Sequence, residues 1–205
     1  MSHKIISVGR QFGSGGHEIG RKTAQRLGVP CYDKELITLA ALRGKMDPEW
    51  TADFDEQPPN PWLYEAAYNA NGELPVGKSV SAVLFNLQSE VIRAIADRED
   101  AVIMGRCANH VLREERDVSL LSVFIAAPFE DRVKRKMGLM NMGRRKAEKL
   151  VRQTDQRRAA YYRTYTGAEW GRQEGYDLYF DSSRQGEEEI VERILAAWSQ
   201  LEAGA

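Results

Sequence analysis

The stretch Val8–Gly20, which reads VGRQFGSGGHEIG, decides the fold of this chain. It continues the apolar run Ile5–Val8, which predicts a buried strand, and it leads into Ile19–Leu27, whose apolar residues recur at helical spacing. Glycines permit positive φ angles and a close backbone approach, so successive N–H groups can point at an anion beside the helix N-terminus. A strand, a glycine-rich turn and a helix in this order predict a cradle for phosphate groups.

Length and composition limit the number of domains, the kinds of partner and the cellular compartment to be expected. The chain has 205 residues and a formal net charge of −1, which fits one buried domain over 1–205 and gives no bulk attraction to nucleic acid or membranes. Cys31 and Cys107 are too few for a disulfide framework or a zinc site, which suits a reducing compartment. No signal-like segment precedes the first strand, and no apolar run approaches the roughly 20 residues of a membrane span. We expect a cytoplasmic protein with neither a membrane nor a nucleic-acid partner.

The rest of the chain alternates predicted strands and helices. Further strands are predicted at 29–32, 101–104, 119–126 and 178–180, and helices at 34–42, 80–98, from 128 onward, and 187–201. Such alternation predicts an α/β fold of three layers, with a parallel sheet and helices on both of its faces. The Pro-rich, aromatic segment 44–79 is expected to be a covering insertion.

The segment 131–165 is strongly basic, with twelve Lys or Arg residues against three Asp or Glu residues. Most of these charges are expected to form a solvated helical face, while two or three close over bound phosphates. A nucleic-acid surface is the alternative, because tyrosines interleave with the arginines near 161–165.

The glycine-rich turn departs from the P-loop pattern GxxxxGK[ST]. Arg10 stands at the first glycine of that pattern, Gly16 at its lysine and His17 at its hydroxyl residue. Arg10 is a candidate replacement for the missing cation, although a planar guanidinium is not equivalent to an ammonium. A literal match occurs at Gly72–Ser79, but no buried strand precedes it. We interpret it as a chance match in which Ser79 caps the next helix.

Charged residues follow two of the predicted strands. Arg106 follows 101–104 after the single residue Gly105, at a place where an arginine is poorly placed for stability and well placed for a ligand. Its alternative is a salt bridge to a carboxylate. Replacing Arg106 by alanine is expected to abolish acceptor binding and to leave the fold intact.

Asp33 follows 29–32, and its alternative is to cap the next helix. Glu18 and Asp33 are candidate Mg²⁺ ligands, and Glu18 alternatively complements the helix dipole.

A dinucleotide-binding loop is a competing interpretation, because Gly9, Gly13 and Gly15 imitate the loop of short-chain dehydrogenases. Those enzymes use a Tyr-x-x-x-Lys pair for proton transfer. No tyrosine in this chain has a lysine four residues later, so this alternative is demoted.

Taken together, these pieces resemble the cytidylate kinase-like family of P-loop kinases. The resemblance rests on 10–16 with 19–22, on 32–35, on Gly105 with Arg106, and on 127–132, in that order along the chain. It implies a P-loop kinase fold, with 44–79 as an acceptor-side insertion and 131–165 as a helical lid. It further implies phosphoryl transfer from ATP, with Mg²⁺, to a nucleoside monophosphate such as CMP or to another small acceptor.

The resemblance and the residues together assign roles. The expected donor-phosphate residues are Phe12, Gly13, Ser14, Gly15, Gly16, His17 and Glu18. The expected catalytic arginines are Arg10, Arg106, Arg132 and Arg158, and the expected substrate-binding residues are Asp33, Arg106 and Asp155. Trp50, Trp62 and Tyr64 are candidates for stacking a base. A nucleotide-binding sensor without kinase activity is the alternative function, because the loop lacks its lysine.

Overall fold

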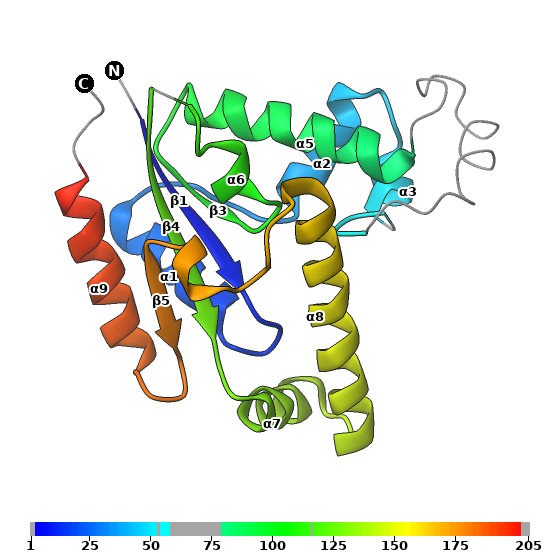
Figure 1. Cartoon of the computed structure of the whole chain (residues 1–205), viewed down its shortest axis with the longest axis vertical. Coiled ribbons are helices and arrows are strands. Elements are labelled where there is room, and N and C mark those ends of the chain that lie inside the picture. The colour runs from blue at the N-terminus through cyan, green and yellow to red at the C-terminus, as the bar shows by residue number, and fades with distance from the viewer. Residues whose placement is uncertain (1–2, 53, 58–78, 116, 202–205) are drawn as a thin grey trace.

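The computed structural model of the chain describes residues 3–52, 54–57, 79–115 and 117–201. A parallel sheet of five strands, in the order β2-β3-β1-β4-β5, forms its centre (Figure 1). The strands are β1 (His3–Arg10), β2 (Cys31–Tyr32), β3 (Ala101–Met104), β4 (Val118–Ala126) and β5 (Leu178–Asp181). The α-helices are α1 (Gly16–Leu27), α2 (Glu35–Arg43), α3 (Pro48–Ala52), α5 (Val80–Ala96), α6 (Ala108–Val111), α7 (Phe129–Met140), α8 (Arg144–Thr166) and α9 (Glu187–Gln200). A short 3₁₀ helix lies at Gln173–Gly175.

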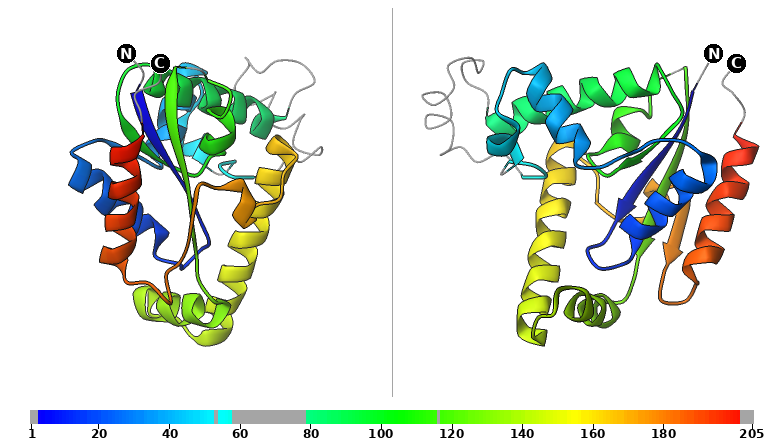
Figure 2. Two further views of the ribbon diagram at one scale, coloured as in Figure 1. Left: turned by 60° about the vertical axis from the view of Figure 1, so that its left-hand side comes forward. Right: turned by 180° about the vertical axis from the view of Figure 1, so that it is seen from behind.

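Helices cover both faces of the sheet, as the sequence predicts (Figure 2). Successive side chains of a strand point to opposite faces, so Ile5 and Ile6 of β1 belong to different cores. Ile6 packs in a cluster with residues of α1 and α9, whereas Ile5 packs with residues of α2, α5 and α6. The predicted three-layer α/β fold is therefore confirmed.

The carboxyl edge of the sheet carries the glycine-rich turn and the basic helices. β1 ends at Arg10, and the turn that follows leads directly into α1. Helices α7 and α8 stand beyond this edge (Figure 1) and share a small core of Val133, Ala147 and Val151, against which Phe12 of the turn packs. Ligands of open parallel sheets bind at this edge, so the fold gathers the candidate residues there.

Several local predictions change. Strand β2 spans only Cys31–Tyr32, and α2 begins one residue later than expected, with Lys34 at its N-cap and no side-chain cap. The capping interpretation of Asp33 is wrong, because that carboxylate turns toward two arginines instead. Pro128 occupies the N-cap of α7 rather than its first turn. Ser79 does cap α5, since its Oγ accepts a hydrogen bond from the N–H of Ala82 at 3.1 Å.

The predicted insertion is described only in part, through α3 and residues 54–57. The P-loop match at Gly72–Ser79, up to residue 78, lies outside the described residues. The candidate stacking residues Trp62 and Tyr64, and the side chain of Trp50, lie outside them too.

Candidate functional site

Two glycines with positive φ angles shape the glycine-rich turn. Gly13 and Gly15 have φ angles of 88° and 83°, which only glycine adopts without strain. Ser14 holds the turn from inside: its Oγ donates to the Gln11 carbonyl at 2.9 Å and accepts from the Gly16 N–H at 3.3 Å. Within the described part of the chain, the N–H groups of Gly13 and Gly15 have no hydrogen-bond partner, so they are available to an anion.

A cavity of about 210 Å³ opens above this turn, and we call it the cradle. Its lining includes most of the predicted phosphate and metal residues together with part of α7. The predicted residues among them are Arg10, Phe12, Gly13, Gly15, Gly16, His17, Glu18, Asp33 and Arg158. Ser14 is fully buried beneath the turn, and its backbone carbonyl accepts a hydrogen bond from Ser182 Oγ at 2.6 Å.

The structure explains why Gly16 replaces the usual lysine. A Cβ atom at residue 16 would lie 2.6 Å from Cβ of Arg10 and 3.0 Å from Cβ of Ile125. The Arg10 side chain thus passes through the space that a side chain at residue 16 needs. Arg10 is 7% exposed, and its Nη2 donates to Asp33 Oδ1 at 3.1 Å. Its guanidinium therefore lies among the sheet ends rather than above the turn.

Helix α7 supplies cations to the cradle that the sequence analysis missed. The Arg135 guanidinium lies directly against Gly15, where a Cβ atom would collide with its Nη1. Lys136 also lines the cradle, with its Nζ 4.4 Å from the centroid of the Phe12 ring. Among the described residues neither cation has a carboxylate within ion-pair distance. Both residues lie three or four positions after Arg132, and this spacing places them on one helix face; that spacing is the signal that could have found them.

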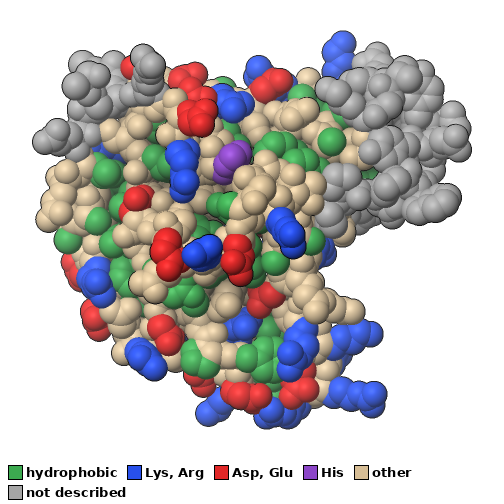
Figure 3. Space-filling model, viewed as in Figure 1, with side chains coloured by type: hydrophobic (Ala, Val, Ile, Leu, Met, Phe, Trp, Pro, Cys, Tyr) green, Lys and Arg blue, Asp and Glu red, His purple; other side chains and the backbone are tan. Residues whose placement is uncertain are grey.

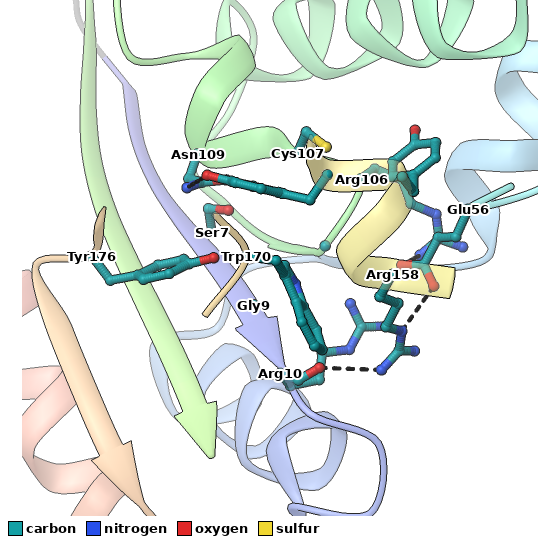
Figure 4. A pocket seen from close by; sticks show the side chains of 13 residues that line it. Ser7, Gly9, Arg10, Glu56, Arg106, Cys107, Asn109, Arg158, Trp170 and Tyr176 are labelled. Carbon is teal, nitrogen blue, oxygen red and sulfur yellow. Dashed lines mark hydrogen bonds and ion pairs between the residues drawn. The ribbon is translucent and has the colours of Figure 1, made fainter. Parts of the chain in front are cut away.

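Three arginines and three carboxylates form a buried network beside the cradle, which we call the arginine cluster. Its members are Arg10, Arg106, Arg158, Asp33, Asp55 and Glu56. Arg106 donates to Asp55 through Nε at 3.0 Å and Nη2 at 2.5 Å, and to Asp33 through Nη1 at 2.9 Å. Arg158 of α8 donates to Glu56 at 2.9 Å and to the Arg10 carbonyl at 3.2 Å (Figure 4). The salt-bridge alternative for Arg106 is therefore realised.

Left-handed backbone brings two parts of this cluster together. Gly105, Arg106 and Cys107 have φ angles of 74°, 51° and 56°, so the chain turns sharply after β3 and folds the Arg106 side chain back over the sheet edge. Glu56 also has a positive φ of 51°. Such backbone in residues other than glycine is costly and tends to occur at functional sites. Asp55 and Glu56 were not predicted, because no sequence period links their segment to Arg106 or Arg158.

Burial and ion pairing act against each other in the cluster: burial prevails for Asp55, whose pKa is raised, and for Arg10, whose pKa is lowered, whereas the opposite charges prevail at the other groups described here. Burial alone would raise the pKa of Glu56, but Arg158, Arg106 and Arg10 lower it to about 2. For Asp33, burial is likewise outweighed by Arg10 and Arg106, and the pKa lies below its usual value. Burial acts to lower the pKa of Arg106, and the charges of Asp55 and Glu56 raise it overall.

Arg132 and Asp155 fasten the glycine-rich turn to the basic helices. Asp155 Oδ1 accepts the N–H of Phe12 at 2.8 Å, and its Oδ2 pairs with Arg132 Nη1. Arg132 also donates to the carbonyls of Ala127 at 2.9 Å and Phe12 at 3.2 Å. The N–H of Phe12 is thus occupied by Asp155, and Arg132 is positioned to hold the turn in shape.

The carboxylates that line the cradle suit a weakly held Mg²⁺. Within the described residues, no group of three or more His, Cys, Asp or Glu side chains is arranged as a metal site. Mg²⁺ in kinases keeps several waters and uses one or two carboxylates together with phosphate oxygens. Asp33 and the exposed Glu18 both line the cradle, so the donor set fits that mode of binding.

The surface at this end of the molecule is positively charged, as expected for a protein that binds an anionic ligand there. Lys and Arg side chains gather over α7 and the start of α8 (Figure 3). No helix among the described residues is both long and apolar enough to cross a membrane.

Comparison with known proteins places the chain in a family. The cytidylate kinase-like family matches residues 5–184, and the chain belongs to that family. No curated protein is similar enough to count as a match.

Solved structures share the fold at low sequence identity. An uncharacterized protein from Eubacterium ventriosum ATCC 27560 is 22% identical, with 97% of this chain and 99% of that chain covered and a TM-score of 0.69. A gluconokinase from Sinorhizobium meliloti 1021 is 17% identical, with 97% and 93% covered and a TM-score of 0.55. A shikimate kinase from Bacteroides thetaiotaomicron is 16% identical, with 97% and 99% covered and a TM-score of 0.52. The fold is that of P-loop kinases, and family and fold together support a kinase of a nucleotide or another small molecule.

Proposed function

We propose that the protein transfers a phosphoryl group from ATP to a small acceptor, either a nucleoside monophosphate such as CMP or another small molecule. The observation that carries this proposal is the lining of the cradle: it combines Gly13 and Gly15, whose N–H groups have no hydrogen-bond partner among the described residues, with Arg135 and Lys136, which have no carboxylate partner there. Phosphoryl transfer asks mainly for alignment and for neutralised charge. The cradle offers both to a polyphosphate.

In this proposal the donor phosphates lie against the turn, and Arg135 with Lys136 takes the place of the missing lysine. Arg10 keeps Asp33 and the sheet ends in position, which differs from the role first expected of it. Arg132 and Asp155 hold the turn to α7 and α8. Mg²⁺ held by Glu18 and Asp33 would neutralise donor phosphate oxygens.

Arg106 and Arg158 are the proposed acceptor-side arginines. Both lie at the carboxyl edge, within the arginine cluster, and Arg158 lines the cradle as well. Arg158 also lines a second, smaller cavity that Arg106 and Glu56 border, so it is well placed at the boundary between donor and acceptor.

The test of this proposal is Arg135→Ala. Arg135 is exposed and makes no ion pair with the described residues, so its removal should leave the fold unchanged. Hydrogen bonds to charged groups contribute about 1.5–3 kcal/mol, so ATP affinity measured by calorimetry should fall roughly 10- to 100-fold. Lys134→Ala is the matched control, because Lys134 is exposed on the same helix and does not line the cradle. Equal ATP affinities of the two variants would contradict the proposal.

A nucleotide-binding sensor is the second candidate, favoured by the carboxylate partners that already occupy the arginines of the cluster. ADP release separates the two functions. ATP binding without ADP release, across monophosphates and small alcohols with Mg²⁺, would support the sensor.

A further inference from the structure

On the basis of the proposed kinase function, we infer that His17 is a ligand of the divalent cation that accompanies the nucleotide, and that the site therefore prefers a first-row transition ion, such as Mn²⁺ or Co²⁺, to Mg²⁺. The inference follows from the place of His17 in the glycine-rich turn, from its distance to Asp33 and from the chemistry of an imidazole donor.

His17 stands where a P-loop provides a hydroxyl group to its metal ion. In the pattern GxxxxGK[ST], the Ser or Thr hydroxyl binds Mg²⁺, and His17 occupies that position as the second residue of α1. Its side chain is 46% exposed, and it lines the cradle, as does the neighbouring Glu18. The position of the usual hydroxyl ligand therefore carries an imidazole, which is itself a common metal ligand.

His17 and Asp33 present two donor atoms to one place in the cradle. Nε2 of His17 lies 3.4 Å from Oδ2 of Asp33, and the imidazole has no other hydrogen-bond or ion-pair partner among the described residues. Two neighbouring ligands of one ion, each about 2.0–2.2 Å from it in octahedral or tetrahedral geometry, lie about 3.0–3.4 Å apart. The observed separation is thus close to that between two ligands of a single cation.

The arginine cluster fixes the orientation of Asp33. Its Oδ1 accepts hydrogen bonds from Arg10 Nη2 at 3.1 Å and from Arg106 Nη1 at 2.9 Å, which leaves Oδ2 for His17 and a cation. Groups that hydrogen-bond to a metal ligand hold it in place and tune its metal affinity. The protein thus supplies one nitrogen and one carboxylate oxygen, and nucleotide phosphate oxygens with water complete the coordination.

An imidazole donor changes which cation such a site prefers. Mg²⁺ is a hard ion that favours oxygen ligands and gives up its water reluctantly. Transition ions accept imidazole nitrogen readily, and the affinity of a site with nitrogen donors rises from Mn²⁺ to Co²⁺. With the nitrogen of His17 in place of a hydroxyl oxygen, the site gains affinity for Mn²⁺ and Co²⁺ relative to Mg²⁺.

The first experiment asks whether a histidine nitrogen binds the cation. Electron spin-echo spectroscopy of Mn²⁺ with saturating ADP and the protein should show modulation from a directly bound nitrogen, and ¹⁵N-labelling of the histidines should alter it. His17→Ser should abolish this modulation while ADP stays bound. His110→Ser is the matched control and should keep it, because His110 is exposed and does not line the cradle. With ADP bound, a wild type without the modulation, or a His17→Ser variant that retains it, overturns the inference.

The second experiment measures the preference between cations by calorimetric titration of ADP with Mn²⁺, Co²⁺ or Mg²⁺. The wild type should bind ADP at least 10-fold more tightly with Co²⁺ than with Mg²⁺. Loss of an imidazole ligand should lower that ratio about 10-fold or more in His17→Ser, whereas His110→Ser should leave it unchanged. Equal ratios in the wild type and His17→Ser, or a wild type that prefers Mg²⁺, overturn the inference. Failure of ADP to bind with any of the three cations would instead count against the proposed function.

Discussion

The cradle and the arginine cluster lie side by side at one sheet edge, and both are rich in cations, yet they differ in how those cations are satisfied. In the cradle, Arg135 and Lys136 have no carboxylate partner among the described residues and are accessible. In the arginine cluster, Arg106 is 4% exposed and is paired on two sides. The cations of the cradle are free to bind an anionic ligand, whereas those of the arginine cluster are already paired with carboxylates of the protein.

The difference shows that a count of basic residues does not locate an anion site. A buried arginine must be compensated within the fold, because an uncompensated buried charge is very costly. A solvated arginine needs no such compensation and stays available. Only exposure and pairing distinguish the two cases, and neither can be read from the basic composition of 131–165.

The largest effect that sharpens this comparison is expected for Arg106→Ala. Removing one partner of a buried ion pair typically costs about 3–5 kcal/mol, because it leaves a buried charge unpaired. Asp55 and Asp33 would lose a shared partner here, so the free energy of unfolding from urea titration should fall by about that amount. This revises the expectation that the fold stays intact. Arg98→Ala removes an exposed pair with Glu99 and should leave the free energy of unfolding nearly unchanged, because solvent screens such pairs. Similar losses for both variants would erase the distinction.

An intermediate effect is expected from pH. The pKa of Glu56 is about 2 in the folded protein against an ordinary value of 4.5. A depressed folded-state pKa gives stability that is present above pH 4.5 and is lost as the pH falls toward 2. At about 1.4 kcal/mol per pKa unit, this loss is on the order of 3 kcal/mol. Urea midpoints of wild type and Glu56→Gln between pH 6 and 2 measure it. The stability advantage of the wild type should shrink as the solution becomes acidic, and a constant difference would contradict the assignment.

The smallest effect concerns the cradle backbone, through Gly13→Ala. At a φ of 88° a side chain costs on the order of 1–2 kcal/mol, and the added Cβ would also lie 2.9 Å from the Arg132 carbonyl oxygen. We expect a stability loss of that size together with weaker ATP binding. Gly28→Ala is the matched control, since Gly28 has a φ of 69° with no atom within 4 Å of the added Cβ. It should lose about 1 kcal/mol and keep its ATP affinity.

Much of the fold was predictable from local patterns. The apolar run before Gly9, the glycines of the turn and the helical spacing after Ile19 are short-range signals, and they gave β1 and α1 in their correct order. The partner requirement of Arg106 was also predictable, because a charge that ends a buried strand must be neutralised.

Long-range parts of the site were not predictable. Asp55 and Glu56 lie about 50 residues before Arg106 in a segment without apolar periodicity, so nothing local aims them at the sheet edge. The reason for Gly16 is the Arg10 side chain, whose path depends on the pairing of Asp33 across two strands. The spacing of Arg135 after Arg132 places the two on one helix face, but that this face turns toward the cradle follows only from the packing of α7.

Helix α8 contacts both the cradle and the arginine cluster. Asp155 holds the turn of the cradle, and one turn later Arg158 holds Glu56 of the arginine cluster. A shift of α8 that breaks the contact of Asp155 with the Phe12 N–H would also disturb the ion pair of Arg158 with Glu56. The conformations of the two regions are therefore coupled through this helix. Thermodynamic linkage then relates the proposed phosphoryl donor and acceptor. If bound donor changes the affinity for the acceptor by some factor, bound acceptor changes the affinity for the donor by the same factor.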